Sequence, residues 1–175
     1  MDPRYDLAAN FIAVYLPAMV TNAAPVAFLS RRRCTPLDLG LVLPDGRRLL
    51  GDGKTVEGVL VGLVSGLAVS LLLALSLPEF SSLLLRTGLV SSCGAIIGDL
   101  AKSFLKRRAG IERGAPLVPA DQLDFYLGAT LLVLACDKCA QPLLASFLLG
   151  LILVPLLHLS TNYAAYKLGL KRVPW

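Results

Sequence analysis

Residues 58–77 read GVLVGLVSGLAVSLLLALSL, a stretch of twenty residues without a charged side chain. As an α-helix it would be about 30 Å long, which matches the hydrocarbon core of a bilayer. Polar residues stand on both sides, with Glu57 before it and Glu79 shortly after it. The stretch therefore predicts a transmembrane helix.

Three more apolar runs have a similar length, at residues 7–29, 83–105 and 143–163. A further run at 123–135 would be only about 20 Å long as a helix. It can span only if its polar start, from Asp121 to Asp124, also lies in the membrane, so we place this span at 120–136. The chain has 175 residues, of which 55% are hydrophobic, and a mean hydropathy of +0.69. We expect an all-α integral membrane protein with about five transmembrane helices, forming one domain over residues 1–175.

Basic residues predict the orientation of these spans. They gather in the connection 30–57, in the connection 106–119 and in the tail, which together contain Arg31, Arg32, Arg33, Arg47, Arg48, Lys54, Lys106, Arg107, Arg108, Arg113, Lys167, Lys171 and Arg172. The opposite side offers Arg4 and Lys138, with Arg86 near its edge. The positive-inside rule then places the N-terminus outside and the two longer loops and the C-terminus in the cytoplasm. These basic loops also explain the net charge of +5 without nucleic-acid binding.

The cysteines give little support to a zinc site. Cys136 and Cys139 form a C-x-x-C pair, but a zinc site needs two further ligands, and the single histidine, His158, lies within an apolar run. We expect these cysteines to be structural, with one local disulfide as an option.

Charged side chains inside the predicted spans gather at the cytoplasmic end. Asp99, Lys102, Ser103 and Lys106 share one helical face, and so do Asp121 and Asp124. If the two helices are neighbours, three carboxylates and a hydroxyl surround one small volume, a ligand set that suits Mg²⁺. Carboxylates in a membrane are costly and so are usually functional. The alternative is that Asp99 pairs with Lys102 or Lys106 and only holds the bundle together.

The stretch Gly53-Lys54-Thr55 stands at the start of the second span. Backbone N–H groups, an ammonium and a hydroxyl at a helix start can bind phosphate. A complete Walker A motif would need glycine at position 48, which is Arg48. Taken alone, Thr55 is equally well explained as a helix cap.

The two elements together resemble the CDP-diacylglycerol synthase superfamily. The residues that carry the resemblance are Lys54-Thr-Val-Glu57-Gly58 entering one helix and Gly98-Asp99-Leu-Ala-Lys-Ser103-Phe-Leu-Lys106-Arg107 ending the next. The short layout is similar to the archaeal branch, the CDP-archaeol synthases. One stretch departs from the bacterial and eukaryotic pattern: Pro119-Ala120 leads directly to Asp121 and Asp124, without the Pro-Gly-His-Gly-Gly and the arginine of those enzymes.

The resemblance implies a cytidylyltransferase that uses CTP and an isoprenoid ether lipid phosphate, 2,3-di-O-geranylgeranyl-sn-glycerol 1-phosphate, to form CDP-archaeol and pyrophosphate. It implies a cell-membrane location with the active site toward the cytoplasm, and Mg²⁺ held by Asp99, Asp121 and Asp124. It also implies that Asp99, Lys106 and Lys54 are catalytic. The implied nucleotide-binding residues are Lys54, Thr55, Glu57, Gly58, Ser103, Lys106 and Arg107.

Three alternatives compete with this interpretation. A small ion or solute transporter would also use acids within the membrane, but the charges collect at one face and no inverted repeat is evident. A lipid kinase or a CDP-alcohol phosphotransferase is a second alternative, although the longer aspartate-rich signature of the latter is not found. A scaffold without enzymatic activity is the third, and it would leave the acidic cluster unexplained.

Overall fold

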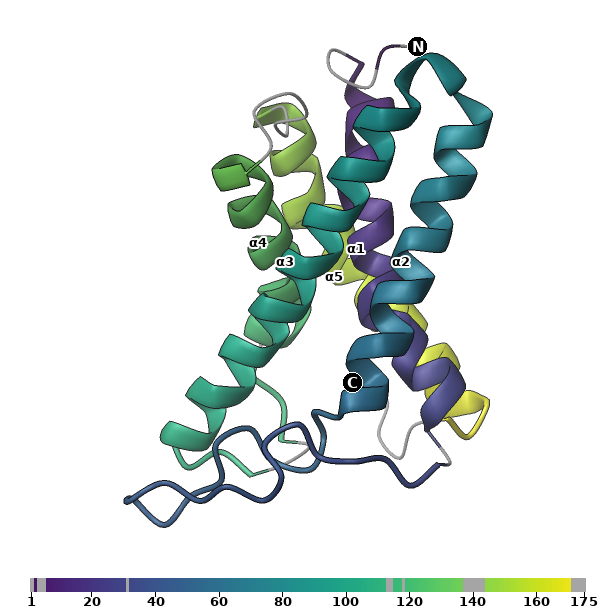
Figure 1. The fold of residues 1–175 in the computed structure, drawn as a ribbon. Helices are drawn as coiled ribbons and strands as arrows, with labels where there is room; N and C mark the ends of the chain where they lie inside the picture. Colours follow the sequence, from purple (N-terminus) through teal and green to yellow (C-terminus); the bar gives the residue numbers. More distant parts are fainter. Residues whose placement is uncertain are drawn as a thin grey trace.

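The protein is described by a computed structural model that covers residues 2, 6–30, 32–112, 115–117, 119–136 and 144–170. Within these ranges it forms five α-helices and one short 3-10 helix, in the order α1 (Leu7–Leu29), α2 (Val56–Ser76), η1 (Pro78–Phe80), α3 (Ser81–Arg108), α4 (Ala120–Cys136) and α5 (Leu144–Lys167). The helices lie roughly along one direction, and the two longer connections lie at the same end of the bundle (Figure 1). The predicted all-α class is confirmed.

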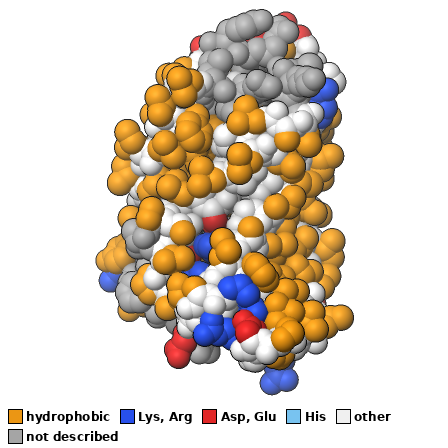
Figure 2. Space-filling view, turned by 90° about the vertical axis from the view of Figure 1, so that its left-hand side faces the viewer, with side chains coloured by type: hydrophobic (Ala, Val, Ile, Leu, Met, Phe, Trp, Pro, Cys, Tyr) orange, Lys and Arg blue, Asp and Glu red, His pale blue; other side chains and the backbone are white. Residues whose placement is uncertain are grey.

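Four helical segments of the described chain are long and apolar enough to cross a membrane: α1, α2, α3 together with η1, and α5. Only 22% of the α2 window and 17% of the α5 window is buried inside the protein. Their outer faces carry exposed apolar side chains such as Leu75 and Ile152. Apolar side chains are also numerous on the face shown in Figure 2. Helix α4 has 17 residues and would be about 26 Å long. The fifth span and the orientation stay predictions.

Small residues allow α1, α2 and α3 to pack closely. A Cβ added at Gly62 of α2 would lie 2.8 Å from the carbonyl oxygen of Thr21 in α1. A Cβ at Gly66 would overlap the hydroxyl groups of Thr21 and Ser92. Gly62 and Gly66, spaced four residues apart, thus let the helices approach closely, as in other membrane helix pairs.

Helices α3 and α4 cross through a contact between glycines. A Cβ at Gly94 would lie 2.5 Å from the carbonyl oxygen of Gly128, and a Cβ at Gly98 would overlap the carbonyl oxygen of Asp124. Because the backbones touch here, the residue after Gly98, Asp99, is brought beside the first turns of α4. The crossing thus sets the distance between the acids of the two helices.

A pair of tyrosines fixes α4 against α1 and α5. Tyr15 and Tyr126 are fully buried, and their ring centroids are 4.4 Å apart. The Tyr15 hydroxyl is hydrogen-bonded to Thr130 Oγ1 at 3.1 Å, and the Tyr126 hydroxyl donates to the carbonyl oxygen of Phe147 at 2.7 Å. Each buried hydroxyl therefore has a partner, as an apolar interior requires.

Candidate active site

Two helices and the loop before α2 contribute charged side chains to one site at the end of the bundle that carries the long connections. Lys54 stands directly before α2, Asp99 and Lys102 lie in the last turns of α3, and Asp121 and Asp124 lie in the first turns of α4. Figure 2 shows acidic and basic side chains gathered toward this end of the molecule. The expected meeting of the α3 and α4 faces is observed.

Lys102 lies among the three aspartates. Its Nζ atom is 2.5 Å from Asp124 Oδ2, 3.1 Å from Asp121 Oδ1 and 3.5 Å from Asp99 Oδ1. The Lys102 side chain is 15% exposed and that of Asp124 only 3%. All three carboxylates are therefore aimed at one point, and an ammonium group is located there.

Lys54 forms an ion pair with Asp99, with Lys54 Nζ 2.5 Å from Asp99 Oδ2. The backbone around Lys54 is held by the preceding loop, since its carbonyl oxygen accepts a hydrogen bond of 2.7 Å from the N–H of Leu37. Its own N–H donates to the carbonyl oxygen of Gly51 at 3.3 Å. The loop thus positions the ammonium of Lys54 beside the last turns of α3.

Lys106 closes the connection between α3 and α4. Its Nζ atom is 3.2 Å from each oxygen of Asp121 and donates to the carbonyl oxygen of Ala115 at 2.6 Å. The N–H of Leu117 donates to Asp121 Oδ2 at 2.6 Å. Lys106 and Asp121 therefore also attach the connection to the site, through Ala115 and Leu117.

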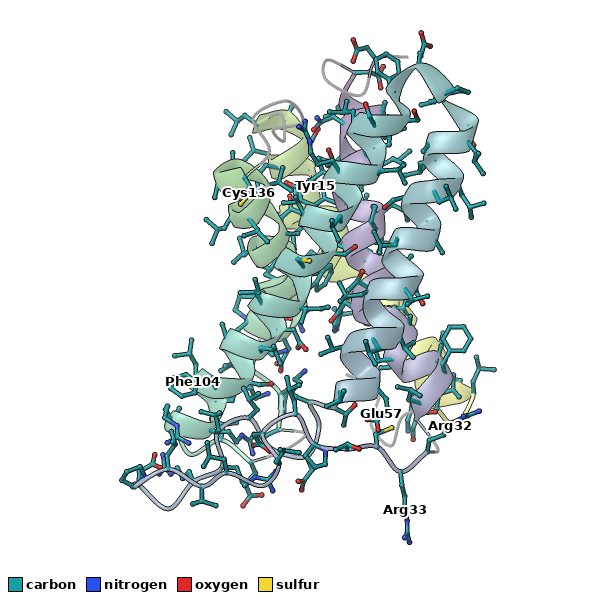
Figure 3. All side chains as sticks on the ribbon, in the orientation of Figure 1. Tyr15, Arg32, Arg33, Glu57, Phe104 and Cys136 are labelled. Carbon is teal, nitrogen blue, oxygen red and sulfur yellow. The ribbon has the colours of Figure 1, made fainter. Side chains whose placement is uncertain are left out.

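Other residues proposed from the sequence have local partners at the start of α2. The Thr55 hydroxyl caps α2 by accepting a hydrogen bond of 3.1 Å from the N–H of Gly58. The Glu57 carboxylate, labelled in Figure 3, accepts hydrogen bonds from the N–H and the hydroxyl of Thr35 at 2.8 and 2.9 Å. These three contacts do not join the ion network, so any contact with nucleotide stays a prediction.

Ser103 and Arg107 lie beside the network on α3. Ser103 is buried, one turn before Lys106. The Arg107 side chain packs near Gly51, where an added Cβ would lie 3.7 Å from Arg107 Cδ. Arg107 Nε is buried and has no hydrogen-bond partner among the described residues.

Sequence reasoning missed Asp38, which organises the loop between α1 and α2. Its carboxylate pairs with Arg48 at 2.5 Å and accepts backbone hydrogen bonds of 2.9 Å from Leu50 and Gly51. The Arg48 guanidinium and these N–H groups hold the pKa of the Asp38 carboxyl well below its usual range, although burial opposes the shift. Nothing periodic in the loop sequence marks this residue.

Two arginines bind this loop to the end of α3. Arg47 donates to the carbonyl oxygens of Arg107 and Arg108, and Arg108 donates to the carbonyl oxygen of Arg48 at 2.6 Å. Arg108 also forms an ion pair of 2.5 Å with Asp45. The sequence feature that could have indicated these contacts is the turn Pro44-Asp45-Gly46, which is followed by two arginines. These contacts between the loop and α3 thus help to keep Lys54 close to Asp99.

The donor set suits a hard cation, because three carboxylates converge on one point. As the side chains stand, no group of three or more histidine, cysteine, aspartate or glutamate residues within the described ranges is arranged to hold a metal ion. The Lys102 ammonium lies between the three carboxylates. The residues therefore fit a cation in chemistry and direction, provided that Lys102 moves.

The fold and this site define an intramembrane enzyme: a bundle of apolar helices with its charged side chains concentrated at one end. The chain belongs to the CDP-archaeol synthase family, since it matches the family described as CarS-like CDP-archaeol synthase over residues 5–175. The transporter, kinase and scaffold alternatives are set aside by this membership.

Relatives and a solved structure agree with the family. The chain is 49% identical over 175 residues to the CDP-archaeol synthase of Aeropyrum pernix, with 100% of this chain and 97% of that protein covered. It is 45% identical over 166 residues to the CDP-archaeol synthase of Thermofilum pendens, with coverages of 91% and 78%. A solved structure, described as an intramembrane enzyme for archaeal membrane lipid biosynthesis, superposes with a TM-score of 0.76 at 46% identity, covering 86% of this chain and 91% of that one.

Proposed function

We propose that this protein transfers the cytidylyl group of CTP to 2,3-di-O-geranylgeranyl-sn-glycerol 1-phosphate. An oxygen of the lipid phosphate attacks the α-phosphorus of CTP, a new P–O bond forms, and the bond to the β-phosphate oxygen breaks to release pyrophosphate. The product is the CDP-activated archaeal ether lipid. The observation that carries the proposal is the joint site of Lys54, Asp99 and the α4 acids in a member of this family.

The reaction needs no strong general base, because a phosphate monoester is already anionic near neutral pH. Positioning and charge neutralisation are therefore the main tasks of the protein. Lys54, Lys106 and Arg107 would neutralise the triphosphate, while the hydroxyls of Thr55 and Ser103 would donate hydrogen bonds. Glu57 and Gly58 would hold the start of α2 in place for this contact. Since Lys54 is paired with Asp99 at 2.5 Å, nucleotide binding would exchange one partner for the other.

Asp99, Asp121 and Asp124 would hold Mg²⁺. When bound, the ion would neutralise charge on the phosphates of the two substrates and align them. The carboxylates of these three residues converge from α3 and α4 on one point. The glycine contact holds α3 and α4 close together, so carboxylates of both helices could bind the same ion once Lys102 has moved.

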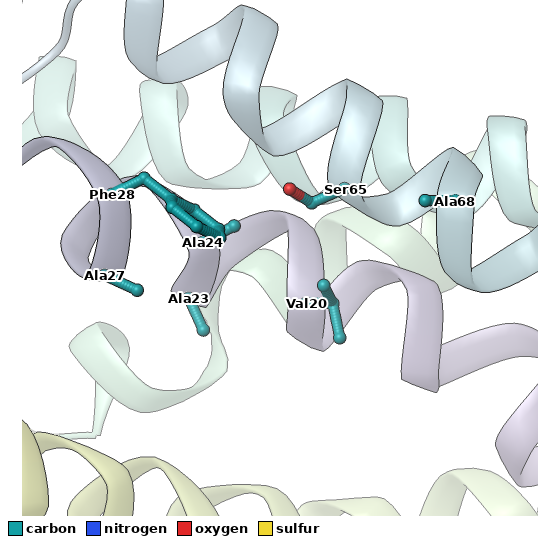
Figure 4. A pocket seen from close by; sticks show the side chains of 7 residues that line it. All are labelled: Val20, Ala23, Ala24, Ala27, Phe28, Ser65 and Ala68. Atoms are coloured by element: carbon teal, nitrogen blue, oxygen red, sulfur yellow. The ribbon is translucent and has the colours of Figure 1, made fainter.

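The lipid chains would lie against apolar helix surfaces, with the head group at the cytoplasmic face of the cell membrane. An open apolar groove of about 390 Å³ lies between α1 and α2 (Figure 4). Its lining is almost entirely apolar and consists of Val20, Ala23, Ala24, Ala27, Phe28, Ser65 and Ala68. It is a candidate binding site for part of one isoprenoid chain.

The test is pyrophosphate release by the detergent-purified protein. Each of the four nucleoside triphosphates is supplied with Mg²⁺ and geranylgeranyl ether lipid phosphate, and omission of lipid or Mg²⁺ serves as the control. We expect release with CTP only, and only when both lipid and Mg²⁺ are present. Absence of release by protein shown to be folded, or release without lipid, would refute the proposal.

A further inference from the structure

Lys102 differs from the other two lysines of the site in its surroundings. Among the described residues, Lys102 forms ion pairs with all three aspartates of the site, Asp99, Asp121 and Asp124. Lys106 also donates to a backbone carbonyl oxygen, and Lys54 stands on a loop before α2 and contacts Asp99 alone of these acids. Lys102 is thus the cation at the centre of the site, and the other two lie toward its edges.

The charges of this cluster cancel. Three lysines face three aspartates, so the formal charge of the site is zero. A divalent cation added to this arrangement would meet three ammonium groups within the same small volume. Like charges so close together are strongly unfavourable in a partly buried site. One ammonium must therefore leave the carboxylates before a divalent cation can bind them.

Distance indicates which ammonium leaves. Mg²⁺ binds oxygen at about 2.0–2.1 Å and needs the point on which its ligands converge. That point is occupied by Lys102 Nζ, at 2.5 to 3.5 Å from the three carboxylates. Lys54 and Lys106 can stay at the edges, but Lys102 and a cation shared by all three acids exclude each other.

We infer that Lys102 is an internal substitute for the metal: its ammonium occupies the cation position in the metal-free protein, and metal binding displaces it. The inference rests on the metal site of the proposed function and goes further by assigning Lys102 a role as a competitor. The exchange keeps the acids neutralised at every stage, which avoids exposing three carboxylates to one another inside a membrane protein. It also lowers the apparent affinity of the free site for divalent cations.

The size of the effect follows from competition. If Lys102 fills the position about nine-tenths of the time, its removal strengthens the apparent metal affinity about tenfold. Lys102→Met removes the charge but keeps most of the apolar stem. Lys102→Arg keeps the charge and the competition. Lys167→Met, in the last turn of α5, is the matched control, because it makes the same change outside the ion network.

The experiment measures binding of Mn²⁺ by electron paramagnetic resonance, with detergent-purified protein and without nucleotide or lipid. Mn²⁺ is a suitable probe because it favours the same oxygen ligands as Mg²⁺. We expect a Kd about tenfold lower for Lys102→Met than for the wild type, and little change for Lys102→Arg and Lys167→Met. An unchanged or weaker affinity in Lys102→Met, or equal strengthening in Lys102→Arg, would overturn the inference.

An alternative variant and a second measurement keep the result interpretable. If Lys102→Met is unstable without metal, Lys102→Gln replaces it in the same comparison, and thermal melting with and without Mn²⁺ gives a second measure. A larger melting shift by Mn²⁺ in the charge-removing variant supports the exchange, and an equal shift contradicts it. Because no substrate is present, the inference can fail while CTP-dependent pyrophosphate release succeeds, and the reverse also holds.

Discussion

Lys54 and Asp99 are separated by 45 residues in the chain and yet form a 2.5 Å ion pair. Each side chain has a task that it cannot perform in this pairing, since Lys54 is proposed to bind phosphate and Asp99 a metal ion. The pair therefore has to separate for the two proposed roles to be filled. Its partners are supplied by different elements, so the loop and α3 must both be in place for the pair to form.

Asp99→Asn should reduce CTP-dependent pyrophosphate release by about a hundredfold or more, because one carboxylate of the proposed cation site is lost. The substitution is nearly isosteric, so the melting temperature should change little. Asp6→Asn is the control, since asparagine also serves well at the α1 N-cap that Asp6 occupies. Full activity of Asp99→Asn with unchanged dependence on Mg²⁺ would contradict the assignment.

Asp38 provides a prediction about pH. Its carboxylate is buried, and the pairing with Arg48 holds its pKa below the value of about 3.9 expected in an unfolded chain. A carboxylate with a lowered folded-state pKa stabilises the fold above the unfolded pKa, and the contribution is lost as the pH falls toward the folded-state pKa. Asp38→Asn should therefore cost about 2 kcal/mol at pH 7. The difference from wild type in thermal melting should narrow progressively below pH 4, whereas a difference that is independent of pH would contradict this account.

The crossing of α3 and α4 determines whether the acids can meet at all. Gly94 and Gly98 of α3 face Gly128 of α4, and the backbones are in contact. Glycine is required there because any Cβ would meet backbone atoms, which cannot turn away as a flexible side chain could. The same contact brings Asp99 and Asp124 to a common lysine.

Gly98→Ala and Gly128→Ala should each destabilise the protein by roughly 1–3 kcal/mol and should also lower activity, because the helices must separate to admit the methyl group. Thermal melting and pyrophosphate release of the same preparations provide the check. Ala101→Val adds methyl groups to an exposed position of the same helix and should change neither quantity appreciably. Normal stability and activity in both glycine variants would show that the contact is not required.

The helices and the acidic faces could be predicted from the sequence, because apolar length and helical spacing are local properties. Asp99 and Lys102 share a face through their spacing alone. The central position of Lys102 could not be predicted in the same way, since it depends on the rotation of α3 against α4. Asp38 was missed because its partners are loop N–H groups and Arg48, which follow no periodic pattern.

The arrangement of the whole chain across the membrane leads to a final prediction. If all five helices cross, Cys34 and Cys136 lie on opposite sides, because Cys34 is in the connection before α2 and Cys136 ends α4. Both cysteines are free thiols in the part of the chain that the structure describes, which does not include Cys139. Figure 3 places Cys136 toward the end of the bundle opposite Glu57. Two variants, each with one of these cysteines as its sole thiol, can be labelled in intact cells with a membrane-impermeant maleimide.

We expect intact cells to label Cys136 and not Cys34, and inside-out vesicles to show the reverse, because basic connections stay in the cytoplasm. Labelling in detergent confirms that both thiols can react. Label on both cysteines from the same side would mean that α4 enters the membrane without crossing it, and a reversed pattern would place the charged site outside. A reversed pattern would separate the site from the cytoplasmic supply of CTP, so this labelling experiment tests the location of the proposed reaction as well as the number of spans.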